Sequence, residues 1–227
     1  MPSRAKFCIG VTIALGLAVL GAGLLFQWQP TPHTRYLSYL ALALLAATRK
    51  VRLPKIQGTV SLNFLFILVG VAELSLGETL LLACPAAAVQ CLWKPKSPPK
   101  LIQVLFNVAV LAISAALAHS LSRLLNPLGG LALLLALATT ILYVANTGLV
   151  SLVLSLLSEQ PLSRVWRQCH LWTFPYYLVG AGIVGVLLVS ERAVGWMPAL
   201  LALPVMYLIY LYYGFCAKLA VGARQDH

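Results

Sequence analysis

Residues 49–93 read RKVRLPKIQGTVSLNFLFILVGVAELSLGETLLLACPAAAVQCLW, and this stretch decides the class of fold. A turn is expected after its basic start, at Pro54 and Gly58. Two apolar segments follow, joined by the polar corner ELSLGE at residues 73–78. Basic residues beside apolar helices, with polar groups inside them, are typical of a membrane hairpin. The basic cluster consists of Arg49, Lys50, Arg52 and Lys55.

The composition of the whole chain agrees with a membrane protein. Of its 227 residues, 61% are hydrophobic and 9% are charged, whereas a soluble domain carries about 25% charged residues. A surface that faces water needs more charged residues than these. We therefore expect the lipid bilayer to surround most of the protein surface. The net charge of +11 lies in short clusters between apolar runs. This pattern favours anchors that flank membrane spans over a nucleic-acid surface.

A transmembrane helix needs roughly 20 apolar residues, and the apolar runs predict about eight spans in one transmembrane domain over residues 1–227. The predicted fold is therefore all-α and polytopic. The sixth run is compatible with one long helix or with two pieces that break at Gly148. A polar loop or interfacial helix is expected at residues 158–170. The predicted spans are residues 8–27, 36–48, 59–74, 77–93, 101–125, 131–157, 172–190 and 197–220.

The distribution of Lys and Arg predicts the orientation of these spans. With eight spans and the N-terminus in the cytoplasm, thirteen of the sixteen basic residues fall on the cytoplasmic side. Only Arg35, Arg123 and Arg192 remain outside. This satisfies the positive-inside rule. Both termini are therefore predicted to be cytoplasmic.

Polar side chains inside the predicted spans are the candidate ligand-binding residues. Gln103 and Asn107 share one helix face because they are four residues apart. Asn146 lies in the sixth span, and Ser61 and Asn63 lie near the start of the third. All five could converge on a small ligand, or they could form interhelical hydrogen bonds without one. Glu73 and Glu78 also have two interpretations. They predict either a capped, ion-paired corner or an outward-facing gate for a ligand or cation.

No catalytic or metal site is predicted. The five cysteines have no metal-ligand spacing, and His119 and His170 lack a carboxylate or cysteine at ligand spacing. No nucleophile elbow, P-loop or dinucleotide fingerprint is present. An enzyme is therefore not expected, and the sequence names no cofactor.

Residues 53–93, followed by KPKSPPKLIQVLFNVAVLAIS, resemble the multi-span membrane modules that precede diguanylate cyclase (GGDEF) or HD-GYP phosphodiesterase domains in bacterial cyclic-di-GMP proteins. The resemblance implies a sensor in the bacterial cytoplasmic (inner) membrane that signals to a cytoplasmic partner. Here the sequence stops at His227 without an output domain, so we expect either that a separate protein partner receives the signal or that this chain uses the same membrane scaffold differently. A second resemblance, of pattern alone, is to the substrate-binding subunits of energy-coupling-factor vitamin transporters.

Three functions remain open at this point. The first is a sensory or small-ligand-binding module with a pocket lined by the five polar residues and a protein partner at the cytoplasmic face. The second is a small-molecule transporter or its substrate-binding subunit, with a pocket open to the outside. The third is a structural subunit of a larger membrane complex, which predicts no internal cavity and amides paired with each other.

Overall fold

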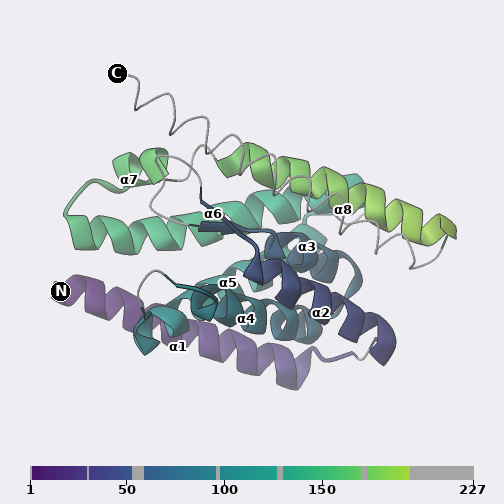
Figure 1. Cartoon of the computed structure of the whole chain (residues 1–227), viewed down its shortest axis with the longest axis horizontal. Coiled ribbons are helices and arrows are strands. Elements are labelled where there is room, and N and C mark those ends of the chain that lie inside the picture. The colour runs from purple at the N-terminus through teal and green to yellow at the C-terminus, as the bar shows by residue number, and fades with distance from the viewer. Residues whose placement is uncertain are drawn as a thin grey trace.

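The computed structural model describes residues 2–29, 31–52, 59–95, 98–126, 130–169 and 173–194, and these are helical apart from one small hairpin (Figure 1). This confirms the all-α class in its coarse form. The elements in chain order are α1 Ser3–Phe26, α2 His33–Thr48, β1 Lys50–Arg52, β2 Thr59–Ser61, α3 Asn63–Glu73, α4 Leu76–Leu92, α5 Leu101–Leu124, α6 Leu131–Ser158, α7 Leu162–Cys169 and α8 Phe174–Val194.

The hairpin corrects the predicted start of the third span. Strands β1 and β2 are antiparallel, and Val51 lies opposite Val60 in the register. Residues 59–62 therefore lie outside the helix, which begins only at Asn63. The alternation of polar and apolar residues in Thr59-Val60-Ser61 has the period of a strand, not of a helix. The predicted turn at Pro54 and Gly58 lies outside the described residues.

Helix α3 is the centre of the packing. All nine residues from Asn63 to Val71 are buried, and α3 contacts α2, α4, α5, α6 and α8. A helix that is apolar on every side is stable only where other elements surround it. Helix α3, which lies within residues 49–93, is therefore the segment around which the described helices pack.

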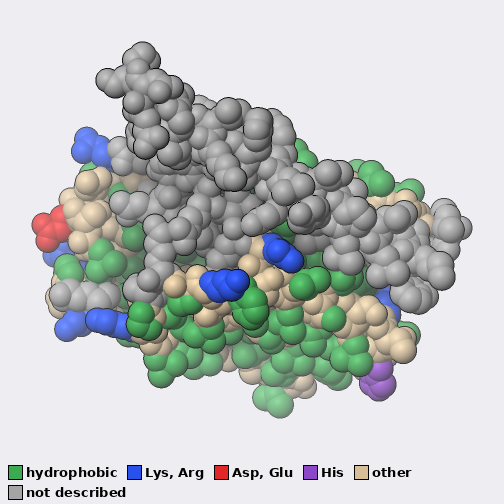
Figure 2. Space-filling model, viewed as in Figure 1, with side chains coloured by type: hydrophobic (Ala, Val, Ile, Leu, Met, Phe, Trp, Pro, Cys, Tyr) green, Lys and Arg blue, Asp and Glu red, His purple; other side chains and the backbone are tan. Residues whose placement is uncertain are grey.

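Within the described part of the chain, three helices are long and apolar enough to cross a membrane: α1, α5 and α6. Large hydrophobic side chains on their outer faces are exposed, including Phe26 at 81% and Leu124 at 74%. Figure 2 shows hydrophobic side chains over most of the described surface on the visible face. A surface of this kind is unfavourable in water, whereas lipid tails can cover it. These features indicate a membrane protein.

The structure decides between the two forms of the sixth span. Helix α6 runs without a break through Gly148 and ends at Ser158. The polar segment after it forms the short helix α7. Of the loop and the helix expected within residues 158–170, the structure therefore has the helix. Helix α8 continues to Val194, four residues beyond the predicted end of the seventh span at residue 190. The predicted eighth span, residues 197–220, lies outside the described residues.

Helix α1 packs closely along α5 because a glycine lies at the contact. A Cβ atom added to Gly16 would lie 2.5 Å from the Cβ of Ala109 and 2.6 Å from its Cα. Small residues allow the backbones of two membrane helices to approach in this way. The N-terminal helix is thus a packed part of the bundle.

Candidate functional site

An aromatic cluster joins four helices on one side of α3. Its members come from α3, α6, α7 and α8, and Tyr143 lies in the middle. The ring centroid of Tyr143 is 4.9 Å from that of Phe174, 5.3 Å from Tyr177 and 6.1 Å from Trp166. The ring of Phe64 lies 4.7 Å from that of Tyr177. The aromatic cluster consists of Phe64, Tyr143, Trp166, Phe174, Tyr176 and Tyr177.

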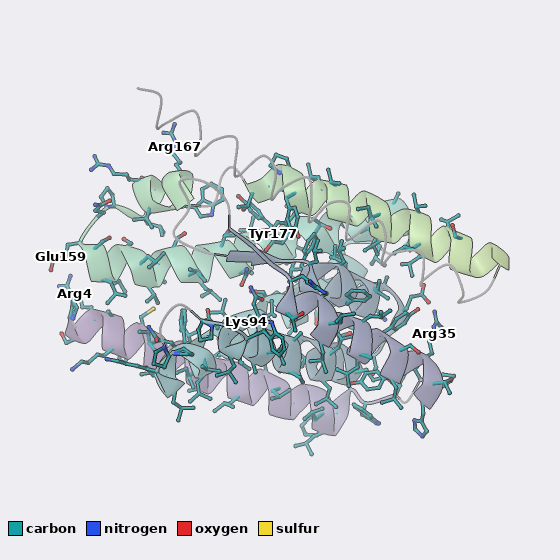
Figure 3. All side chains as sticks on the ribbon, in the orientation of Figure 1. Arg4, Arg35, Lys94, Glu159, Arg167 and Tyr177 are labelled. Atoms are coloured by element: carbon teal, nitrogen blue, oxygen red, sulfur yellow. The ribbon has the colours of Figure 1, made fainter. Side chains whose placement is uncertain are left out.

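Polar groups at the edges of the aromatic cluster hold its rings in place. The Asn146 side chain lies close to the Tyr177 hydroxyl, and the Thr173 side chain lies close to that of Tyr143. Trp166 Nε1 donates to Thr147 Oγ1 at 3.0 Å, and that hydroxyl donates to the Tyr143 carbonyl oxygen at 2.6 Å. The predicted ligand residue Asn146 on α6 therefore lies at the cluster, beside Tyr177 of α8, and Figure 3 labels Tyr177.

The aromatic cluster is filled by its own side chains. A cavity of about 10 Å³ lies beside Phe64 and Tyr176, with apolar walls. This volume accommodates about one water molecule. Gly180 on α8 lies against the Phe64 ring so closely that an added Cβ would overlap it. Binding of a larger molecule here requires side chains or α8 to move.

Asn63 lies in a different polar contact at the start of α3. Its side chain is 5% exposed, and Nδ2 donates to Gln90 Oε1 on α4 at 3.1 Å. Gln90 was not among the residues expected from the sequence. Ser61 belongs to β2, and its side chain lies outside the described part of the chain.

In the structure, Gln103 and Asn107 lie apart from Asn63 and Asn146. Both side chains are exposed on α5, whereas Phe106 and Val110 occupy the buried face of that helix. Asn107 Nδ2 donates to the backbone oxygen of Gln103 at 2.9 Å, and Gln103 Oε1 accepts from the N–H of Lys100 at 2.9 Å. The two amides do share one face of α5, as expected. That face points away from the bundle, so among the described side chains no pocket joins all the predicted residues.

The corner between α3 and α4 confirms the predicted capped structure. Ser75 and Glu78 form a capping box at the start of α4. The Glu78 side chain is buried, and it also accepts from the N–H of Thr31 at 2.6 Å and from the Thr31 hydroxyl at 2.8 Å. Glu78 therefore ties the loop between α1 and α2 to the corner.

Ion pairing and carbonyl contacts close the same corner from two other helices. Arg35 on α2 pairs with Glu73 at 3.2 Å. On α5, His119 Nε2 donates to the Leu74 carbonyl at 3.2 Å, and Arg123 donates to the same carbonyl at 3.1 Å. These contacts satisfy backbone oxygens at the end of α3 that have no helical partner. The corner is a structural junction of four helices.

The described residues contain no group of three or more His, Cys, Asp or Glu that could hold a metal ion. Comparisons with models of protein families, with curated proteins and with solved structures found no match to this chain. The two resemblances of the sequence therefore remain predictions.

Proposed function

We propose that this chain is a membrane-embedded sensory module in the bacterial cytoplasmic membrane, which binds a small molecule at the aromatic cluster and signals to a cytoplasmic protein. The observation that carries the proposal is the connection of the aromatic cluster to α7. Trp166 belongs both to the cluster and to this short helix, which lies outside the long apolar spans. A change inside the bundle therefore reaches a helix that a soluble partner can touch.

The mechanism follows from the packing. Because the aromatic cluster is filled, a ligand binds by displacing the ring of Tyr177 or the facing part of α8. Tyr143 contacts the rings of both Tyr177 and Trp166, so this displacement changes the support of α7. A ligand that prefers the displaced arrangement shifts the population of α7 positions.

The experiment is native mass spectrometry of the protein extracted gently from its own membrane. A small molecule at one per chain is expected, and Asn146→Leu together with Tyr177→Phe is expected to remove it without unfolding the protein. Gln103→Leu and Asn107→Leu are matched controls, because these amides are exposed, and both variants retain the molecule. Loss in the controls and retention in the cluster variants would contradict the proposal.

The signal is tested separately with Trp166→Phe. This variant keeps an aromatic ring in the cluster but loses the hydrogen bond to Thr147. It is expected to retain the small molecule while weakening co-purification of the cytoplasmic partner. Equal recovery of the partner from wild type and variant would show that α7 does not take part in signalling.

A structural subunit of a larger membrane complex is the second candidate, and the paired amides of Asn63 and Gln90 favour it. It predicts a stable set of protein partners and no small molecule in the same mass spectra. A transporter has less support, because Thr31, Ser75 and Glu78 bridge the corner predicted to face outside.

A further inference from the structure

A cleft of about 610 Å³ opens between the start of α1 and the end of α6. Its walls include Ser3 and Arg4 from α1, and Ser155, Glu159 and Gln160 from α6 and the turn after it. Figure 3 shows Arg4, on α1, and Glu159, directly after α6, at this end of the molecule. The volume lies in the range of about 300–1,000 Å³ that is usual for small-molecule sites.

The lengths of the two helices place this cleft at the level of lipid headgroups. Helix α1 has 24 residues and α6 has 28, which correspond to lengths of about 36 and 42 Å. The hydrocarbon core of a bilayer is about 30 Å thick. Both helices therefore extend beyond it, and their ends meet at the same end of the molecule (Figure 1).

The cleft carries one charge of each sign. Arg4 and Glu159 are both exposed, and neither belongs to the ion pair found among the described residues, which joins Arg35 and Glu73. A guanidinium binds phosphate oxygens by charge-assisted hydrogen bonds, and a carboxylate accepts them from an ammonium group. A ligand that carries both a phosphate and an ammonium group offers a partner to each charge.

Glu159 has a backbone conformation that an acidic residue seldom adopts. It ends α6 with φ 54° and ψ 27°, in the left-handed region. Glycine or asparagine is the usual residue at such a position, because a Cβ atom is strained there. A strained residue that presents a charge to a cleft is a recognised sign of a functional position.

We infer that the cleft between α1 and α6 binds the headgroup of a zwitterionic phospholipid with a primary ammonium, of the phosphatidylethanolamine class. Arg4 binds the phosphate, and Glu159 accepts hydrogen bonds from the ammonium. The acyl chains run down the apolar outer face of α1, where Phe7 and Val11 are exposed, and that of α6, where Leu152 and Leu157 are exposed. This site is separate from the aromatic cluster and does not depend on a ligand there.

The test uses the full-length protein, stripped of lipid and reconstituted in nanodiscs with phosphatidylethanolamine, phosphatidylcholine or phosphatidylglycerol as equal minor components. Bound lipid is counted by native mass spectrometry after release into detergent. Phosphatidylethanolamine is expected to be retained about tenfold over the other two, since each lacks one charge-assisted hydrogen-bonding group. Phosphatidylcholine has no ammonium N–H, and phosphatidylglycerol has no cation. Equal retention, or a preference for phosphatidylglycerol, would overturn the assignment.

Three variants sharpen the result. Arg4→Gln and Glu159→Gln each reduce retention of phosphatidylethanolamine by about tenfold. Glu159→Gly reduces it equally but raises the thermal unfolding midpoint, because glycine relieves the left-handed strain. Lys6→Gln is the control: Lys6 is basic and exposed on the same helix but does not line the cleft, so retention is unchanged. Competition by soluble glycerophosphoethanolamine at concentrations comparable to the lipid would show that the free headgroup suffices and that the membrane is not its source.

Discussion

Asn63 Nδ2 at the start of α3 lies 3.1 Å from Gln90 Oε1 in the last turn of α4, so two amides that are 27 residues apart in sequence satisfy each other. One partner is almost fully buried, and the other is half-buried. In lipid or protein interior, an amide without a partner is unfavourable. The pair therefore fixes the register of α3 against α4 at the end opposite the Glu73–Glu78 corner.

This relationship predicts a measurable coupling. Asn63→Leu and Gln90→Leu should each lower the free energy of unfolding, and the double variant should lose less than the sum. The expected coupling energy is about 0.6 kcal/mol, with an upper limit near 1.7 kcal/mol, as for other membrane hydrogen bonds. Unfolding of the four proteins in mixed micelles gives the value. Strict additivity would show that the pair contributes nothing.

The Glu78 carboxylate should be the most sensitive polar group of the corner. Glu78→Leu leaves the N–H groups of Thr31 and Ser75 without their acceptor, and the expected loss is at least about 2 kcal/mol. Glu73→Gln is the comparison, because its partner Arg35 is 32% exposed, so its loss stays below about 1 kcal/mol. Thermal unfolding in one detergent ranks the two. A larger effect at Glu73 would contradict the described roles.

Two glycines on α8 provide a matched test of close packing. Gly180→Ala places a Cβ against the Phe64 ring and 2.8 Å from Leu65 Cδ2, and the expected loss of stability is about 1–3 kcal/mol. Gly182→Ala meets nothing within 4 Å and should gain up to about 1 kcal/mol from helix propensity. Their unfolding midpoints should therefore move in opposite directions. Parallel shifts would show that α8 does not pack on Phe64 as described.

The predicted orientation can be checked with reporter fusions. Green fluorescent protein fused after His227 should fluoresce, because it folds only when it remains in the cytoplasm. Alkaline phosphatase fused after Thr31, in the first predicted outside loop, should be active, and fused after His227 it should be inactive. An active phosphatase at His227 would mean an odd number of spans, contrary to the positive-inside count.

The long spans were predictable, whereas the faces that they bury were not. The apolar runs gave α1, α5 and α6 to within a few residues at most ends, and the spacing placed Gln103 and Asn107 on one face. Which face points inward could not be deduced, because both lipid and protein interior accept apolar side chains and a membrane helix shows little amphipathic contrast. A contact between distant residues, such as Thr31 and Glu78, which are 47 residues apart, leaves no local signal in the sequence. The capping pattern of Ser75 and Glu78 does leave a local signal.

The shortness of α3 has a consequence for biosynthesis. Its 11 residues extend only about 16 Å, roughly half of the hydrocarbon thickness. Such a segment cannot leave the translocon as an independent span, because its ends would place unsatisfied backbone groups in lipid. It must partition together with α4 as a helical hairpin, in which both helices contact α2 and α4 also contacts α1. Insertion of this protein is therefore expected to be delayed at α3 until α4 has been synthesised.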